Sequence, residues 1–273
     1  MKIAAFYENI AEGARASGVP LEEALARLKD AGLSLLCLTP ESWERDGKVL
    51  GPVLARTGIG IEGLHAVCDF AREPGTERYR EILGLASSLG AGNVLLIPGF
   101  LTTGDTGKAV LDMREGMRRA ALFGAEHGMP VLMEDYDGLL APYNSIAGLA
   151  WFLDAVPELG CAFDTGNFCM YHEDELRAFR RFRDRIVTVH LKDRSPVRVF
   201  PGDSPKICAD RKEIYPSVVG QGTIRIREIL EGLREQGYGG NVIVEHYDTD
   251  PLRMLGAIEA SVRTVRAFPG LSE

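Results

Sequence analysis

The chain has 273 residues, of which 45% are hydrophobic and 26% are charged, and this is ordinary for a globular protein with a large core. Its 31 basic and 39 acidic residues give a net charge of -8. That acidic balance argues against nucleic acid as a partner, because phosphates need a basic protein face.

Short apolar stretches of strand length alternate along the chain with longer segments of helical periodicity. Amphipathic helices are predicted between the strands, for example at 20–32, 77–92 and 113–129, and several end in glycine just before the next strand. The predicted strands are 2–7, 33–38, 60–65, 93–98, 130–134, 160–164, 186–191 and 241–246.

Eight strand-then-helix units in this length predict a single-domain closed (β/α)8 TIM barrel over residues 1–273. An open doubly wound sheet is the alternative, but the segment after the first strand contains no GxGxxG phosphate turn. One long connection, at about 192–222, is rich in proline, glycine and charge. Because it follows the seventh strand, we expect it to lie over the C-terminal mouth of the barrel and to affect substrate choice.

The last four predicted strands each end in a metal-competent side chain. Strand side chains alternate between faces, and the residues between these ends and their inward neighbours are apolar in all four strands. The shared parity directs all four groups into the barrel at its C-terminal end, where they would repel one another without a cation. Three carboxylates and one imidazole suit Mn²⁺, Mg²⁺ or Co²⁺, and Zn²⁺ stays open. The four residues are Glu134, Asp164, His190 and Glu245.

In these four residues and in the segments around them, the chain resembles the sugar phosphate isomerase/epimerase family of xylose-isomerase-like TIM barrels. The most specific segments are "VLMEDYDG", "AFDTGN", "VHLKD" and the stretch from "GQGTIRIREIL" to "VIVEH". The resemblance implies a metal site of Glu134, Asp164, His190 and Glu245, in which the two glutamates are also the catalytic acid/base pair. Relatives include ketose 3-epimerases, inosose dehydratase, hydroxypyruvate isomerase and endonuclease IV.

Four further residues are predicted to contact the substrate. His65 ends the third strand, and Lys192 follows His190 by two residues and so shares its inward face if the strand continues. Asn167 stands where ketose 3-epimerases have a substrate-binding histidine. Arg194 is one of the basic residues of the long connection. The alternative for His65 is a structural hydrogen bond. The alternative for Lys192 is a salt bridge to Asp193 or to a carboxylate of the mouth.

These features predict a metal-dependent isomerase or epimerase that acts through an enediolate on a small keto-sugar, polyol or sugar acid. The nearest alternative is a dehydratase or lyase of the inosose dehydratase type, because it shares the proton-abstraction step. An endonuclease IV-like phosphoesterase and a sugar-binding protein without activity are more distant alternatives.

The five cysteines form no CxxC pair and are odd in number, which argues against a disulfide framework and a thiolate zinc site. The N-terminal stretch turns polar too early for a signal peptide, and no apolar run approaches the ~20 residues of a membrane span. We therefore expect a cytoplasmic protein with no membrane partner, and we leave open whether it forms a homo-oligomer.

Overall fold

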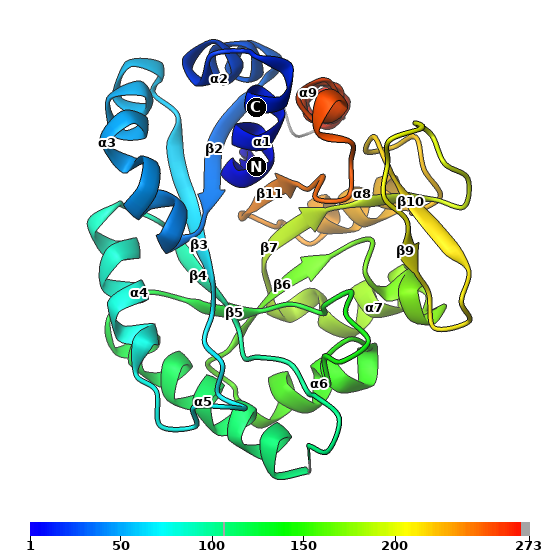
Figure 1. Cartoon of the computed structure of the whole chain (residues 1–273). Coiled ribbons are helices and arrows are strands. Elements are labelled where there is room, and N and C mark those ends of the chain that lie inside the picture. Colours follow the sequence, from blue (N-terminus) through cyan, green and yellow to red (C-terminus); the bar gives the residue numbers. More distant parts are fainter. Residues whose placement is uncertain (106, 269–273) are drawn as a thin grey trace.

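A computed structural model describes residues 1–105 and 107–268, and its strands form a closed barrel (Figure 1). All neighbouring strands that pair in this barrel run parallel, apart from local register shifts. The barrel order is β1-β11-β7-β6-β5-β4-β3-β2, which confirms the predicted TIM barrel. The barrel strands are β1 Ile3–Phe6, β2 Leu33–Leu38, β3 Gly60–Val67, β4 Asn93–Ile97, β5 Val131–Met133, β6 Gly160–Asp164, β7 Ile186–Leu191 and β11 Asn241–Val244.

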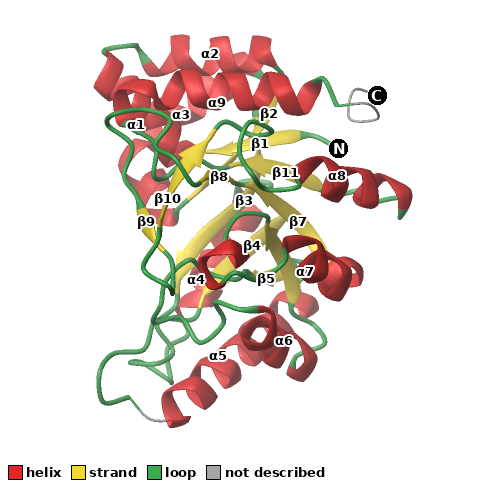
Figure 2. Ribbon diagram, turned by 90° about the vertical axis from the view of Figure 1, so that its right-hand side faces the viewer, coloured by secondary structure: helices red, strands yellow, loops and turns green. Residues whose placement is uncertain are grey.

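Helices surround the strands on the outside (Figure 2). The three glycines expected to end helices, Gly32, Gly90 and Gly128, all have positive φ, a conformation in which a side chain would be strained. Among the helices, α9 packs against α1 and α2. The helices are α1 Tyr7–Ser17, α2 Leu21–Ala31, α3 Pro40–Thr57, α4 Arg78–Ser88, α5 Gly107–Glu126, α6 Ile146–Ala155, α7 Glu175–Phe182, α8 Ile226–Glu235 and α9 Pro251–Arg266, with short 3-10 turns η1 Phe168–Tyr171 and η2 Arg183–Arg185.

The alternation of side chains along the barrel strands agrees with the predicted parity. Leu132, Ala162 and Ile243 belong to small apolar clusters inside the barrel. Their neighbours in sequence pack in the large cluster that the strands share with the helices; these are Met133, Phe163 and Val244. The side chains two residues beyond these inward positions therefore also point into the barrel, at its C-terminal end.

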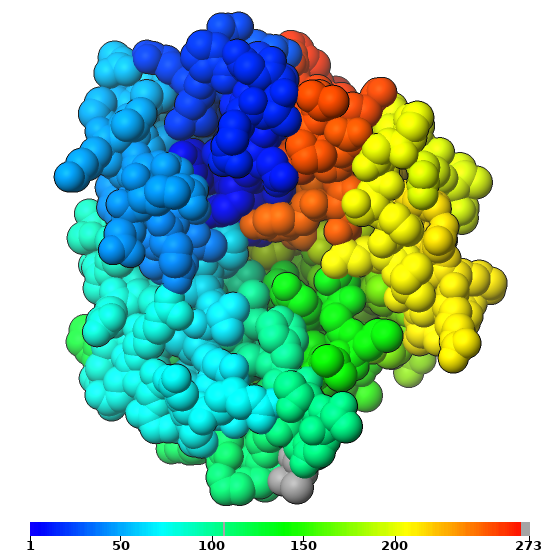
Figure 3. Space-filling model, viewed as in Figure 1, coloured from blue at the N-terminus to red at the C-terminus, as the bar shows by residue number. Residues whose placement is uncertain are grey.

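The long connection after β7 is more ordered than a plain loop. It contains β8 Asp193–Ser195, β9 Lys206–Ile207 and β10 Glu213–Ser217, which pair antiparallel in the order β8-β10-β9. The Asp193 carboxylate accepts hydrogen bonds from the backbone N–H groups of Gly220, Gly222 and Ile224. These bonds tie the end of the connection to its start. Figure 3 shows this segment in yellow beside the orange residues that follow β11.

The helices within 1–105 and 107–268 include none that is both long and apolar enough to span a bilayer.

Candidate active site

Three predicted metal ligands gather at the C-terminal end of neighbouring strands. Glu134 directly follows β5, Asp164 ends β6 and His190 lies near the end of β7. One side-chain donor atom from each lies within 4.8 Å of the others, and all three residues are buried. The three therefore offer two oxygen donors and one nitrogen donor to a single point.

The fourth predicted ligand, Glu245, lies beside His190 but also has a cationic partner. Its Oε2 is 3.4 Å from His190 Nδ1, and the same nitrogen is 3.0 Å from Glu134 Oε2. Its Oε1 is 2.5 Å from Lys192 Nζ. That ammonium also lies 3.4 Å from Asp164 Oδ2 and donates a hydrogen bond to Asn167 Oδ1. Lys192 therefore sits among the carboxylates, which is the salt-bridge alternative considered for it.

The ionisation of these groups reflects their crowding. Burial alone would lower the pKa of His190 and of Lys192, but the surrounding carboxylates raise both well above their usual values. Burial raises the pKa of Asp164 to about 7, against the opposing effect of Lys192. For Glu245, burial would raise the pKa, yet Lys192 and His190 hold it well below the usual range. The charged groups of the site thus attract one another strongly, and the Asp164 carboxyl is partly protonated near neutral pH.

The donor set fits one divalent cation. Asp164 Oδ2 and His190 Nδ1 are buried and make no hydrogen bond within the described part of the chain. A metal-binding site needs Asp164 deprotonated and His190 neutral. In that state three carboxylates face one lysine in this inner group, so two negative charges are left over. Buried charges need partners, and a divalent cation would supply two. Oxygen and imidazole donors are also the set that Mn²⁺, Mg²⁺ or Co²⁺ prefers.

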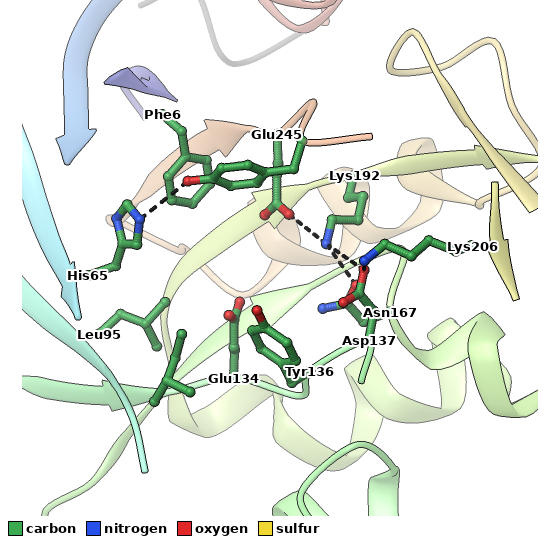
Figure 4. Close-up of a pocket in the computed structure, with 12 residues that line it drawn as sticks. Phe6, His65, Leu95, Glu134, Tyr136, Asp137, Asn167, Lys192, Lys206 and Glu245 are labelled. Atoms are coloured by element: carbon green, nitrogen blue, oxygen red, sulfur yellow. Dashed lines mark hydrogen bonds and ion pairs between the residues drawn. The ribbon is translucent and has the colours of Figure 1, made fainter. Parts of the chain in front are cut away.

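Of the predicted metal ligands, Glu134 and Glu245 line a cavity of about 260 Å³ (Figure 4). Glu134 and Glu245 come from different sides of the cavity and point toward one another. Asn167 and Lys192, two of the residues predicted to contact the substrate, also line it. The remaining lining residues are Phe6, His65, Leu95, Ile97, Tyr136, Asp137, Lys206 and Tyr247.

His65 reaches the cavity from β3, as its position at the predicted strand end suggested. Its Nε2 is 3.3 Å from the Tyr247 hydroxyl and 3.9 Å from Glu8 Oε2, and its Nδ1 is 3.6 Å from Cys37 Sγ. Burial lowers the pKa of His65, and Glu8 opposes that effect. The residue can therefore contact a substrate while it also has protein partners.

Arg194, in contrast, is absent from the described residues that line the cavity. Its side chain is 2% exposed and pairs with two carboxylates. Nη1 lies 2.5 Å from Asp248 Oδ2, and Nη2 lies 3.1 Å from Asp137 Oδ2. We therefore replace the predicted substrate contact of Arg194 with a structural role, in which it links the segments that follow β5 and β11.

Replacing Arg194 by methionine should lower the free energy of unfolding by about 3 kcal/mol, because the change removes a buried guanidinium from two largely buried carboxylates, whose side chains are 10% and 14% exposed. Lys206 still contacts both carboxylates, which keeps the loss near the lower end of the usual range. Urea unfolding of both proteins measures the difference. Arg198, whose guanidinium is exposed and lies over the Tyr215 ring, gives the control. If Arg198→Met cost as much as Arg194→Met, the buried linkage would not matter.

The sequence interpretation missed Asp137, Asp248 and the two tyrosines of the cavity wall, Tyr136 and Tyr247. A repeated pattern could have found most of them, because Glu134 and Glu245 each begin a Glu-x-Tyr-Asp segment. The tyrosine of each segment lines the cavity. The aspartate of each contacts Arg194 and Lys206.

His246, next to Glu245, points away from the cavity, as strand alternation implied. It is buried, with Nδ1 3.1 Å from Thr249 Oγ1 and Nε2 2.8 Å from Ser261 Oγ. Burial lowers its pKa to about 4, with a further contribution from Arg194. His246 is therefore a neutral packing residue behind the site.

The burial of the His246 imidazole predicts that the free energy of unfolding depends on pH. Between pH 6.5 and about 4 the unfolded chain binds a proton at His246 that the folded chain does not, so stability should fall as the pH drops through this window. The full effect is about 3 kcal/mol, from about 1.4 kcal/mol for each pH unit of difference. Urea unfolding at pH 7 and pH 4.5 should show a smaller loss in His246→Gln than in the unchanged protein. Equal losses in both would exclude His246 as the titrating group.

Part of the chain is similar in sequence to an inosose dehydratase from Lacticaseibacillus casei, with 29% identity over 143 residues. The match covers 50% of this chain and 47% of that enzyme. The chain thus spans about half the length of the curated relatives it matches.

Solved structures match over nearly the whole chain. The IOLI protein with a bound zinc atom superimposes with a TM-score of 0.75 at 15% identity, and the match covers 100% of this chain and 98% of that one. The probable 3-DHS dehydratase AsbF from Bacillus anthracis gives a TM-score of 0.72 at 14% identity, covering 97% of this chain and 98% of that one. At such identities the likeness shows the fold alone. Residues 7–268, however, also match in sequence the family described as xylose isomerase-like TIM barrel. The chain therefore belongs to the xylose isomerase-like TIM barrel family.

Proposed function

We propose that the protein is a metal-dependent isomerase or epimerase of a small keto-sugar, polyol or sugar acid. Family membership and the inosose dehydratase match support the coarser statement that it is a sugar-modifying enzyme of isomerase, epimerase or dehydratase type. One observation carries the finer proposal: three carboxylates and an imidazole converge next to a small cavity, and two of the carboxylates, Glu134 and Glu245, line it. Such a group is built to bind a cation and to move a proton.

The metal ligands in this proposal are Glu134, Asp164, His190 and Glu245. A divalent cation bound by them would polarise a substrate carbonyl and acidify the adjoining C–H bond. Mn²⁺ is our first choice for this donor set, and Zn²⁺ remains a candidate because a zinc atom is bound in the structurally similar IOLI protein.

The proton transfers are assigned to the chain's own carboxylates. Glu134 and Glu245 point toward one another across the cavity, so each can approach a different side of a bound substrate (Figure 4). One glutamate removes the proton from the carbon beside the carbonyl to form an enediolate, and the other returns a proton. Lys192 Nζ, 2.5 Å from Glu245 Oε1, holds that carboxylate in place and can stabilise negative charge that develops on the substrate. Asn167 and His65 would orient hydroxyl groups.

A dehydratase is the second candidate, and the sequence match to inosose dehydratase favours it specifically. The same proton abstraction would then be followed by loss of a hydroxyl group from the next carbon. The phosphoesterase alternative has less support. Endonuclease IV-like chemistry needs several metals, whereas one group of three metal-competent residues gathers in the described chain.

A screen of metal-reconstituted protein tests the proposal. Ketoses, inososes and sugar acids, each with its phosphorylated form, are incubated with protein loaded with Mn²⁺, Mg²⁺, Co²⁺ or Zn²⁺. An isomerase or epimerase should give a product of unchanged mass, and a dehydratase should give a product that has lost water. No reaction with any compound under any metal, together with cleavage of abasic DNA, would replace the proposal by the phosphoesterase alternative.

A further inference from the structure

We infer that the natural substrate is an uncharged carbohydrate of about monosaccharide or cyclitol size, without a phosphate or carboxylate group. This inference rests on the proposed function and narrows its substrate class. It follows from the way that positive and negative charges match in the site. The aromatic and aliphatic residues of the cavity wall support it.

The inner group balances with one divalent cation in place. Glu134, Asp164 and Glu245 supply three negative charges, and Lys192 supplies one positive charge among them. A divalent cation cancels the other two. Lys192 is 8% exposed and already contacts carboxylates at 2.5 and 3.4 Å, so its charge is matched before a substrate enters.

The outer group balances without any ion. Arg194 and Lys206 face Asp137 and Asp248, and each cation lies within 4 Å of both carboxylates. Lys206 Nζ is 3.2 Å from Asp137 Oδ2 and 3.6 Å from Asp248 Oδ1. Lys192 and Lys206 are the lysines among the described residues that line the cavity, and both are paired in this way. An anionic substituent would therefore enter a site whose cations are already matched.

Glu8 adds a carboxylate behind His65, which is one of the lining residues. Its carboxylate accepts hydrogen bonds from the backbone N–H and hydroxyl of Thr39, and it lies 3.9 Å from His65 Nε2. Like charges brought together in a partly buried site repel strongly, because water screens them poorly there. A carboxylate in this position disfavours a phosphate or carboxylate group on a substrate that contacts His65.

The rest of the wall suits the neutral faces of a sugar or cyclitol. Phe6, Tyr136 and Tyr247 present aromatic rings, and Leu95 and Ile97 present aliphatic carbon. Such surfaces pack against C–H groups, while tyrosine hydroxyls remain available for hydrogen bonds. The volume of about 260 Å³ is below the ~300–1,000 Å³ usual for drug-sized ligands, so a single small ring fits the cavity better than a disaccharide.

Matched pairs of probes test the inference by binding alone. Protein loaded with Mg²⁺ is titrated with D-fructose and D-fructose 6-phosphate, and with myo-inositol and myo-inositol 1-phosphate, by ligand-observed NMR. In at least one pair the neutral compound should bind at least about tenfold more tightly than its phosphorylated partner. Tighter binding of the phosphorylated compound in both pairs, or no binding of either neutral compound at saturating concentration, would overturn the inference.

Asp248→Asn provides a sharper test of the physical cause. The change removes one of the two carboxylates that match Arg194 and Lys206, so a positive charge becomes unbalanced beside the cavity. The ratio of the affinities for the neutral and the phosphorylated probe should fall by about tenfold, because the phosphorylated probe should bind more tightly to this variant. Asp154→Asn is the matched control, because Asp154 pairs with Arg181 on the exposed surface and its loss changes the net charge equally. An unchanged preference in folded Asp248→Asn, or an equal change in Asp154→Asn, would refute the charge-balance argument.

Different results would contradict the substrate inference and the proposed reaction. If a phosphorylated sugar binds more tightly than its neutral partner and is isomerised, the substrate inference is wrong and the proposed function stands. If the neutral probes bind with the expected preference but no sugar in the screen reacts, the inference stands and the proposed reaction is wrong.

Discussion

Glu134→Gln and Glu245→Gln should each lower turnover of an active substrate by about 10²–10⁴-fold, because glutamine keeps the shape of the side chain but cannot take up the proton. Both side chains line the cavity and point toward one another. The loss should appear in kcat more than in KM, since the interaction removed is one made in the transition state. Steady-state kinetics with a substrate from the screen measures it.

Deuterium incorporation separates this acid/base role from a purely structural one. Reaction in D₂O should place solvent deuterium at the reacting carbon of the product, unless one shielded base carries the same proton across. Glu228→Gln, a change at an exposed position of α8, should leave both turnover and deuterium incorporation unaltered. Full turnover by both Glu134→Gln and Glu245→Gln would rule out the acid/base assignment even with an intact metal site.

His190→Ala and Asp164→Asn should each lose a bound divalent metal ion that the unchanged protein holds at about one per chain. Both residues belong to the three whose donor atoms lie within 4.8 Å of one another, and neither donor atom has a hydrogen bond within the described residues. Metal analysis after dialysis measures the loss. Metal affinity should also fall as the pH drops below about 7, because Asp164 must release its proton before it binds a cation.

The matched control for metal binding is His127→Ala. His127 is exposed near the end of α5, where its Nδ1 lies 2.7 Å from the Phe123 carbonyl oxygen. This variant should keep full metal content, and circular dichroism should show that all three variants retain their helices. Full metal occupancy in both His190→Ala and Asp164→Asn would mean that the ion binds elsewhere.

The sequence alone was enough to predict the barrel and the direction of its key side chains. All eight predicted strands are present, and differences are limited to a few residues at their ends, such as the helix that begins already at Tyr7. Strand alternation is a local rule with a period of two residues, so it placed Glu134, Asp164 and His190 on one inner face from their neighbours in sequence. The glycine ends of the helices are equally local, because they depend on the backbone angles of single residues.

Only the tertiary structure decided which charges meet. Arg194 is separated by 57 residues from Asp137 and by 54 from Asp248, and no periodic pattern in the long connection indicates that it lies between them. The position of Lys192 among the carboxylates likewise depends on where β6, β7 and β11 end relative to one another. Ion pairs act over a few ångströms in space and carry no preference for spacing along the chain. For that reason the convergence of Glu134, Asp164 and His190 could be predicted from the strands that carry them, whereas the charge balance of the cavity required the folded arrangement of its loops.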